Sequence, residues 1–270
     1  MPIPFHFVSA NESILSLSAR PADLGQNACM QPSGIIFAAL DCDAAVIEDW
    51  NRWYDLEHTP PNVMLEGVML SNRYVATPEL HAARQTADGS PFGGGRASFI
   101  TIYTLTGDPQ IAFDDMSTLR ERLIATGRMA FPEDRKAVRE GDCFQSVEGF
   151  FSPPTKLVPA DVPFVGHTGV VLRQRRGGHE ASLARAARLV DLDFVHGVWS
   201  LSSRLRDGLE MDIVFVEGDS ASAAKKMREA EPVDSATQVL VDAPYDRINP
   251  MHYPWADEIR NSDLPKTVAL

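Results

Sequence analysis

The stretch EDWNRWYDLEHTPP, residues 48–61, brings together side chains suited to acid–base chemistry. Its histidine, His58, is our candidate general acid or base, because imidazole exchanges protons near neutral pH. A structural role is the alternative, since a histidine in the last turn of a helix also interacts with the carbonyl end of the helix dipole. Asp55, three residues earlier, is a catalytic candidate that could orient the imidazole, although an ion pair with Arg52 is the favoured interpretation of its carboxylate.

Aromatic residues share the helical face of this histidine. Trp50 and Tyr54 precede His58 at steps of four residues, so the three side chains align and could wall a pocket for a flat substrate. We group Tyr54 with the catalytic candidates because its hydroxyl needs a partner, and Trp50 with the substrate-binding residues, although core packing is the commoner role of a tryptophan there. Trp53 is rotated to another face, and we expect it to pack or to cover the pocket edge.

The strand that follows, within EGVMLSNRYVAT, carries three further candidates. Alternation along a strand places Asn72 and Tyr74 on one sheet face and Arg73 on the other, and one of these sets must face the helices. An arginine beside the pocket could hold a substrate carboxylate or stabilise an enolate, so Arg73 is a catalytic candidate. Asn72 and Tyr74 are substrate-binding candidates, with Asn72 as the alternative partner of the oxyanion. An inter-sheet or surface ion pair is an equally good interpretation of Arg73.

The composition excludes several classes of partner. Its 25 Lys and Arg against 37 Asp and Glu give a formal net charge of −12, which repels nucleic acid and anionic membrane surfaces. The start of the chain does not resemble a signal peptide, and no apolar run of about 20 residues could span a membrane, so we expect a cytoplasmic protein. The seven histidines form no HxH, HxxxH or HExxH pair, and the glycines of FGGGR precede a strand rather than a helix, so neither a metal nor a cofactor is predicted.

Hydrophobic periodicity predicts an α+β fold built from two copies of one unit. Strands and helices follow in the order β-α-β-β-α-β, the ferredoxin-like arrangement of an antiparallel sheet with both helices on one face. The halves are also similar in sequence, since GVMLSNRYVA resembles GVWSLSSRLR and ITIYTLTGD resembles MDIVFVEGD. We expect an N-terminal arm, a first repeat that holds the site, a linker, a structural second repeat and a C-terminal tail, at residues 1–33, 34–152, 153–163, 164–243 and 244–270.

The uncovered face of each sheet predicts how the repeats associate. We expect the two sheets to pack face to face with the helices outside, as a pseudo-dimeric α+β barrel. An insertion in the first repeat, PELHAARQTADGSPFGGGRA, carries His81, a substrate-binding candidate, and is long enough to suggest a lid or binding segment. In the second repeat the position that matches His58 is Arg188, with no Trp-Tyr-His set around it, which places the site in the first repeat.

Prolines set two further expectations. Pro60 and Pro61 are expected to stop the helix after His58, because proline lacks an amide donor and the residue before it avoids helical geometry. The tail, DAPYDRINPMHYPWADEIR, is expected to wrap extended over another surface.

The text WNRWYDLEHTP, followed by LEGV and SNRY, resembles the dimeric α+β-barrel superfamily, and within it the EthD-like members. The resemblance covers the first half well and the second in outline. It implies the barrel fold and a small-molecule substrate. A homodimer is a possible assembly. The superfamily includes monooxygenases without cofactors, isomerases, cyclases, dehalogenases and haem enzymes, so fold alone selects no reaction.

The preferred interpretation is a cofactor-independent lyase, decarboxylase or isomerase that acts on a small aromatic or unsaturated carbonyl or carboxylate compound, as in the catabolism of aromatic compounds. His58 would be its general acid or base. Two alternatives stay open at this stage. One is a cofactor-free monooxygenase of the same fold, and the other is a non-catalytic small-molecule-binding or stress-related protein.

Overall fold

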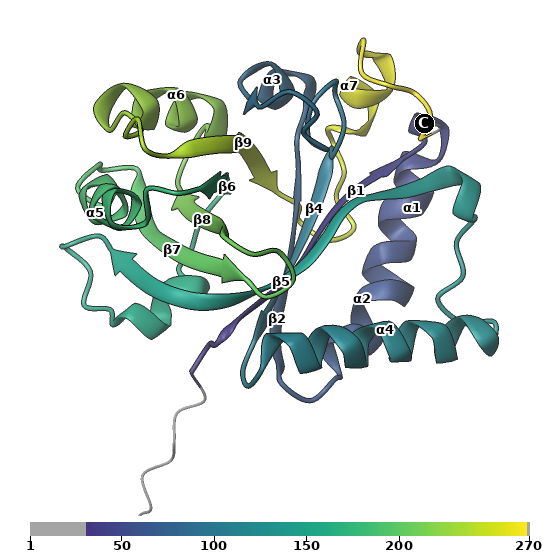
Figure 1. The fold of residues 1–270 in the computed structure, drawn as a ribbon. Coiled ribbons are helices and arrows are strands. Elements are labelled where there is room, and N and C mark those ends of the chain that lie inside the picture. The colour runs from purple at the N-terminus through teal and green to yellow at the C-terminus, as the bar shows by residue number, and fades with distance from the viewer. Residues whose placement is uncertain (1–30, 269–270) are drawn as a thin grey trace, which may run out of the picture. The chain divides into compact units, whose positions relative to one another are not determined.

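Two β-α-β-β-α-β units follow each other along residues 31–268, the part of the chain that the computed structural model describes (Figure 1). The first unit consists of β1 (Gly34–Cys42), α1 (Ile47–Trp53) with its continuations η2 (Tyr54–His58) and α2 (Thr59–Val63), β2 (Val68–Val75), β4 (Phe99–Leu105), α4 (Pro109–Ala125) and β5 (Lys136–Phe151). The second consists of β6 (Gly169–Arg176), α5 (His179–Leu189), β7 (Val195–Ser203), β8 (Leu209–Val216), α6 (Ser220–Ala230) and β9 (Gln238–Arg247). The arm expected at 1–33 lies, apart from its last residues, outside the described part.

Smaller elements complete the described part. They are the short turns η1 (Ala44–Val46), η3 (Glu133–Arg135) and η4 (Pro159–Phe164), the inserted elements α3 (Pro78–Ala82) and β3 (Gln85–Thr86), and α7 (Ala256–Asn261).

The strands form one antiparallel sheet that closes on itself. Its order is β2-β4-β1-β5-β7-β8-β6-β9, and β9 pairs with β2 again. Each half keeps the strand order of a ferredoxin-like sheet. The halves join along β5 and β7, and again where Tyr74 and Val75 pair with Arg247 and Asp246. The predicted fold, two tandem ferredoxin-like repeats forming an α+β barrel, is confirmed, and the sheets meet at both edges as well as face to face.

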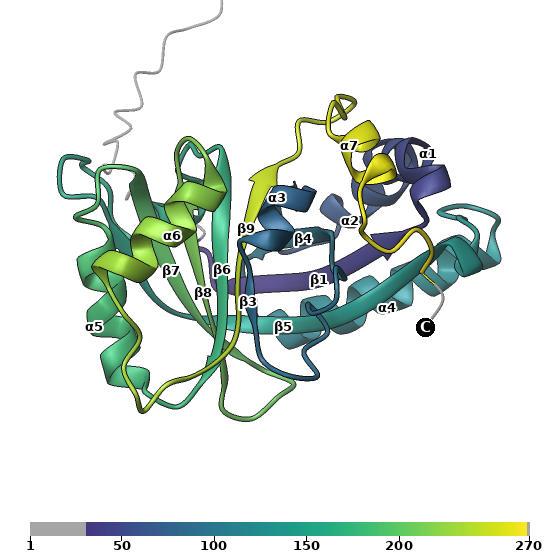
Figure 2. The same cartoon turned by 90° about the horizontal axis from the view of Figure 1, so that it is seen from above.

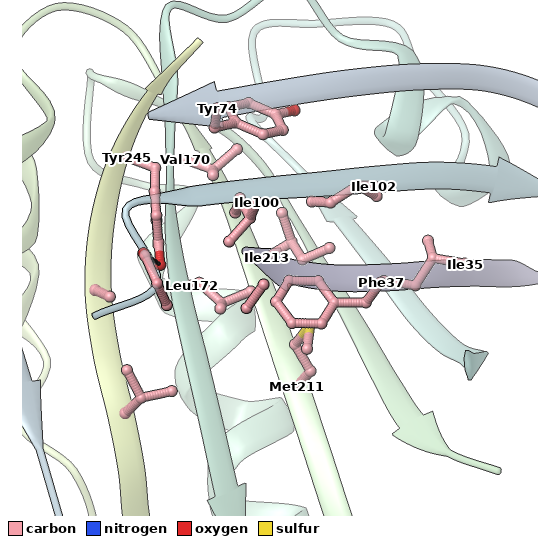
Figure 3. Packing of buried hydrophobic residues seen from close by; sticks show 14 of the residues in the cluster. Ile35, Phe37, Tyr74, Ile100, Ile102, Val170, Leu172, Met211, Ile213 and Tyr245 are labelled. Atoms are coloured by element: carbon pink, nitrogen blue, oxygen red, sulfur yellow. Dashed lines mark hydrogen bonds between the residues drawn. The ribbon is translucent and has the colours of Figure 1, made fainter. Parts of the chain in front are cut away.

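The inner face of the barrel is a single apolar core to which both halves contribute. Alternate residues of each strand point inward, because successive side chains of a strand lie on opposite faces. Figure 3 shows side chains from both halves meeting in this core. They include Ile35 and Phe37 of β1, Ile100 and Ile102 of β4, Val170 and Leu172 of β6, and Met211 and Ile213 of β8.

The helices cover the outer face of the sheet. The helix formed by α1, η2 and α2 lies with α4 over the first half, and α5 and α6 lie over the second (Figures 1 and 2). Among the helices of residues 31–268, none has the length and apolar character needed to cross a membrane.

The insertion plugs the barrel rather than covering the helical face. β3 pairs with β9, and Phe92 enters the barrel core, with its ring centroid 6.4 Å from that of Phe37. Arg84 stacks over the ring of Tyr245 at 4.6 Å and donates hydrogen bonds to two carbonyl groups of its own insertion. The insertion, expected to be a lid or binding segment, contributes no residue to the lining of the cavity beside His58, because an apolar anchor fixes it inside the barrel.

The helix does not stop before Pro60 and Pro61, contrary to the prediction. It widens into the π-helical turn η2, in which the amide of Thr59 donates to the carbonyl of Tyr54, and then continues as α2. The wider turn moves the missing proline donors and the proline rings out of the α-helical hydrogen-bond ladder. Two prolines can therefore follow His58 without ending the helix.

The tail is partly helical instead of extended. β9 runs to Arg247, α7 follows within the same segment, and Trp255 packs on Phe99 with ring centroids 5.6 Å apart. The amide of Val268 and the carbonyl of Lys266 bind Asp43 and Ala44 at the start of the first helix. The tail thus fastens the helix that carries His58 to the rest of the barrel.

Candidate active site

A cavity of about 360 Å³ lies between the outer face of the first half-sheet and the two helical segments above it. Its floor comes from alternate residues of β1, which point away from the barrel core. One wall is the helix α1–η2–α2, and the other is a stripe of α4 whose members recur at steps of three and four residues. The floor residues are Ile36, Ala38 and Leu40, and the α4 stripe is Phe113, Met116, Ser117 and Arg120.

The expected set of aromatic residues and histidine lines this cavity together. The imidazole of His58 lies 4.3 Å from the ring centroid of Tyr54 and 4.9 Å from that of Trp53, and Trp50 packs edge-on against Tyr54 at 5.2 Å. The position of Trp53 differs from the prediction. The π-helical turn after Trp53 changes the angular spacing of the following side chains, so Trp53 and His58 come to share a face.

His58 is a neutral imidazole in this site. Burial, together with the positive charges of Lys136, Arg73 and Arg120, lowers its pKa from 6.5 to about 3. Its Nδ1 atom is buried and has no hydrogen-bond partner within residues 31–268. A neutral ring nitrogen is therefore left for a group that enters the cavity.

Three further residues of the cavity wall also have a buried polar atom without a hydrogen-bond partner within residues 31–268. The indole Nε1 atoms of Trp50 and Trp53 and the amide Oδ1 of Asn62 are buried without a hydrogen-bond partner in the described part of the chain. Buried polar groups are normally paired, and the other unpartnered atoms in the described part of the chain belong to Thr59, Ser71, Arg84, Arg175, Glu210 and Thr237. The aromatic rings that line the cavity suit a flat molecule.

Asn62 and Tyr103 were not found by sequence reasoning. Asn62 donates from its Nδ2 to the hydroxyl of Tyr103, 3.3 Å away, and both residues line the cavity. Asn62 lies beyond the prolines that were expected to end the helix. The periodic step of four from His58 would have indicated it, had the helix been continued.

The hydroxyl of Tyr54 finds its partner inside the protein. Thr101 donates to it at 3.1 Å, and burial raises the pKa of Tyr54 above its usual value. Tyr54 thus presents its ring to His58, and its hydroxyl is neutral and held on the sheet.

Arg73 faces the helices, but its guanidinium group is engaged behind the cavity wall. It donates to Asp55 Oδ1 and to Asn51 Oδ1, both at 2.6 Å, and stacks over the ring of Tyr54 at 4.1 Å. The side chain is 7% exposed and lies outside the cavity lining. The expectation that Arg73 binds substrate oxygen in this pocket is therefore wrong in its geometry, because Asp55 and Asn51 occupy its donors.

Asp55 does not orient His58. Besides Arg73, its carboxylate accepts from the amide of Met251 at 2.9 Å and from the hydroxyl of Tyr253 at 2.5 Å. The widened turn separates residues three apart, so the expected bond across one α-helical turn does not form. The alternative pair with Arg52 is also wrong, since the partner is the buried Arg73.

The remaining sequence candidates lie away from the cavity. Asn72 accepts a hydrogen bond from Arg247 at 2.9 Å across the seam between the halves. Tyr74 points into the barrel core, and its hydroxyl lies 2.9 Å from His167. His81 lies 3.1 Å from the hydroxyl of Ser98 in the insertion, where burial lowers its pKa to about 2. These three residues do not join His58 because strand alternation and the insertion direct them elsewhere.

Charged residues form the mouth of the cavity. Arg120 of α4, Glu133 of η3 and Lys136 of β5 line it, and their side chains are 48%, 69% and 15% exposed. One oxygen of Glu133 lies 3.1 Å from Lys136 Nζ and 3.3 Å from an Arg120 nitrogen. The lining of the cavity thus includes two cations and one carboxylate besides its aromatic residues and His58.

The second half fills the corresponding space with ion pairs. Counted along the two strands, Ala38 of β1 corresponds to Arg173 of β6, which binds Asp242. Leu40 corresponds to Arg175, which donates to Asp212 at 3.1 Å. Arginines therefore occupy the second half where the first half has apolar floor residues.

Comparison with known proteins finds distant structural likenesses. No family model matches the sequence. No curated protein matches it either. Solved structures resemble it, among them an anthrone oxidase-like protein with 10% identity, a TM-score of 0.43 and coverage of 80% of this chain and 92% of that one. Others are a candidate monooxygenase from Fusobacterium nucleatum (6% identity, TM-score 0.44, coverage 81% and 94%) and a candidate chlorite dismutase (10% identity, TM-score 0.48, coverage 86% and 98%). At this identity the likeness concerns architecture and not the reaction.

Within residues 31–268 no group of three or more His, Cys, Asp or Glu side chains is arranged to hold a metal ion.

Proposed function

We propose that this protein is a cofactor-independent oxygenase that acts on a flat, electron-rich aromatic compound bearing a phenol or ketone oxygen. The observation that supports it is the cavity itself, in which aromatic side chains and a neutral imidazole line an apolar space. The finer resemblance to EthD-like proteins, and the names borne by the structural relatives, are consistent with this proposal.

The first step would be removal of a proton from the substrate by His58. The indole N–H groups of Trp50 and Trp53 would bind the substrate oxygen on which negative charge develops. Burial and nearby cations keep the pKa of His58 low in the free protein. When His58 takes the proton, the substrate anion formed beside it pairs with the imidazolium and raises this pKa. The aromatic walls would hold the ring system flat during this transfer.

The second step would be reaction of the carbanion or phenolate with dioxygen. Dioxygen is apolar and enters an apolar cavity without needing a polar contact, and exclusion of water protects the reactive anion. For a methylene group between aromatic rings the balance is R₂CH₂ + O₂ → R₂C=O + H₂O. The proton taken by His58 leaves in the water formed.

The lyase, decarboxylase or isomerase reaction is the second candidate. It shares the proton transfer, and the cations at the cavity mouth could hold a carboxylate. It ranks lower because Arg73, the residue expected to bind that group beside His58, is committed to Asp55 and Asn51.

An oxygen electrode tests the proposal with anthrone and 2-naphthol as substrates. We expect oxygen uptake in proportion to product, and a fall in rate of about 100-fold or more in His58→Gln, the usual contribution of a general base. His81→Gln is the matched control, because it replaces another buried histidine outside the cavity. An absorption spectrum of the purified protein shows whether haem or flavin accompanies it.

Two outcomes would contradict the oxygenase. Turnover under argon at the aerobic rate would favour the lyase or isomerase reaction. Unchanged oxygen uptake in His58→Gln would remove His58 from the chemistry, and failure of both compounds to bind would leave the cavity without the proposed role.

A further inference from the structure

The lining of the cavity combines aromatic side chains with positive charge, which constrains the chemistry of its substrate. Trp50, Trp53 and His58 belong to the lining, and so do two cations, Lys136 and Arg120. A substrate in the cavity therefore meets apolar rings and positive charge together.

The cations are held in place by the fold. Lys136 is the first residue of β5 and lies with its ammonium group 5.0 Å from the ring centroid of Trp53, and its side chain is 15% exposed. Arg120 belongs to the α4 stripe that also presents Phe113 and Met116 to the cavity. Both charged groups thus lie at the rim of the same apolar space.

A single carboxylate oxygen already lies between these two cations. Oε1 of Glu133 is 3.1 Å from Lys136 and 3.3 Å from Arg120. Glu133 is 69% exposed and belongs to the three-residue turn η3. Exposed ion pairs contribute about 0–1 kcal/mol, so exchange of this carboxylate for another costs little.

We infer that the substrate carries a carboxylate, and that Lys136 and Arg120 bind this carboxylate in place of Glu133. This inference rests on the proposed function, since it assumes that the cavity receives a flat aromatic molecule. A substrate carboxylate enters with its ring system already in the apolar cavity, so it gains the charge contacts together with apolar burial. Glu133 gains no such burial. Lys136 and Arg120 are then specificity-determining residues, and Glu133 is the group that the substrate displaces.

Calorimetric titration with two matched probes tests this inference. The probes are 2-naphthol and 6-hydroxy-2-naphthoate, which share the ring system and the hydroxyl and differ by the carboxylate. We expect wild-type protein to bind 6-hydroxy-2-naphthoate about tenfold more tightly, the effect of a charge-assisted pair at a partly exposed site. The preference should shrink at high salt, because rim charges are screened.

Variants assign the preference to the cavity mouth. Lys136→Met and Arg120→Met keep the apolar stems and remove the charges, so each should reduce the preference for 6-hydroxy-2-naphthoate over 2-naphthol to about threefold or less. Glu133→Gln removes the competing carboxylate and should increase the preference. Arg122→Met is the matched control, since Arg122 lies on the same helix, is exposed and does not line the cavity.

The outcomes separate this inference from the proposed function. Equal affinity of wild-type protein for both probes would overturn the carboxylate inference and leave the aromatic cavity in place. A preference that survives both cation substitutions would overturn it as well. Failure of both probes to bind would contradict the proposed function, and the inference with it.

Discussion

The unpartnered atoms around His58 are costly in the free protein. Each buried polar atom without a partner costs about 1–3 kcal/mol, and the indole nitrogens of Trp50 and Trp53 and the Nδ1 of His58 all fall in this class within the described chain. Arg73, by contrast, is paired with Asp55 and Asn51. A ligand that reached the unpartnered atoms would recover part of their cost.

The lowered pKa of His58 makes a prediction for stability against pH. The unfolded chain binds a proton below about 6.5 and the folded chain does so below about 3, so the unfolded state binds more protons between these values. The folded state therefore loses stability as pH falls through this window. At pH 5 the loss from this residue is about 2 kcal/mol.

Urea unfolding of His58→Gln at pH 7.5 and pH 5 measures this contribution. The variant should lose about 2 kcal/mol less than wild-type protein between the two pH values, because glutamine takes up no proton. The cause in the fold is the burial of His58 and the nearby Lys136 and Arg120. Equal losses in variant and wild type would show that His58 titrates normally and is open to water.

At the scale of elements, the sequence pattern predicted the helix and its aromatic face but not the turn that shapes it. Steps of four residues placed Trp50, Tyr54 and His58 on one cavity, as the structure shows. A π-helical turn leaves no periodic signature, because it adds one residue to one turn without changing residue types. Because proline usually ends a helix, the predicted helix stopped before Pro60, and Asn62 was not recognised as a residue of the cavity. The partner of Asp55 was equally out of reach, since it comes from a strand 18 residues away.

The extra residue of η2 is predicted to set the direction of His58. Leu56 is 52% exposed, so its deletion removes little packing while it converts η2 to α-helical spacing. The deletion is best made with Pro60→Ala and Pro61→Ala, because proline in an α-helical interior costs about 3 kcal/mol. We expect a folded protein in which Trp53 and His58 no longer share a face.

Circular dichroism and 2-naphthol titration check this prediction. The deletion protein should retain helical and sheet signals and bind 2-naphthol at least about tenfold more weakly than the double proline variant, which is the matched control. Undiminished affinity in the folded deletion variant would mean that the π-helical turn has no part in forming the cavity.

At the scale of the whole molecule, the repeat in the sequence was enough to predict the barrel. Two sheets that each have one uncovered apolar face commonly pack these faces against each other. The sequence did not predict that Phe92 enters the barrel core, because this depends on where a long insertion comes to lie. It also did not predict the two residue pairs between β2 and β9, because the ends of these strands are far apart in the sequence. In the second half Arg173 and Arg175 carry ion pairs at the strand positions that correspond to Ala38 and Leu40 of the first half.

A shared core predicts that the two halves unfold together. Leu172 of the second half is fully buried in the barrel among residues of both halves, and Leu→Ala in such a core costs about 2–5 kcal/mol. If the barrel opens as one unit, Leu172→Ala should speed hydrogen exchange of the most protected amides of β1 and β6 by the same factor, about 30-fold or more. Mass spectrometry of peptides from both strands measures this.

Val158→Ala, at an exposed position, is the control and should leave both strands unchanged. Faster exchange confined to β6 would mean that the first half, with its cavity, is stable without the second. Equal acceleration would mean that the His58 cavity depends on the stability of both halves.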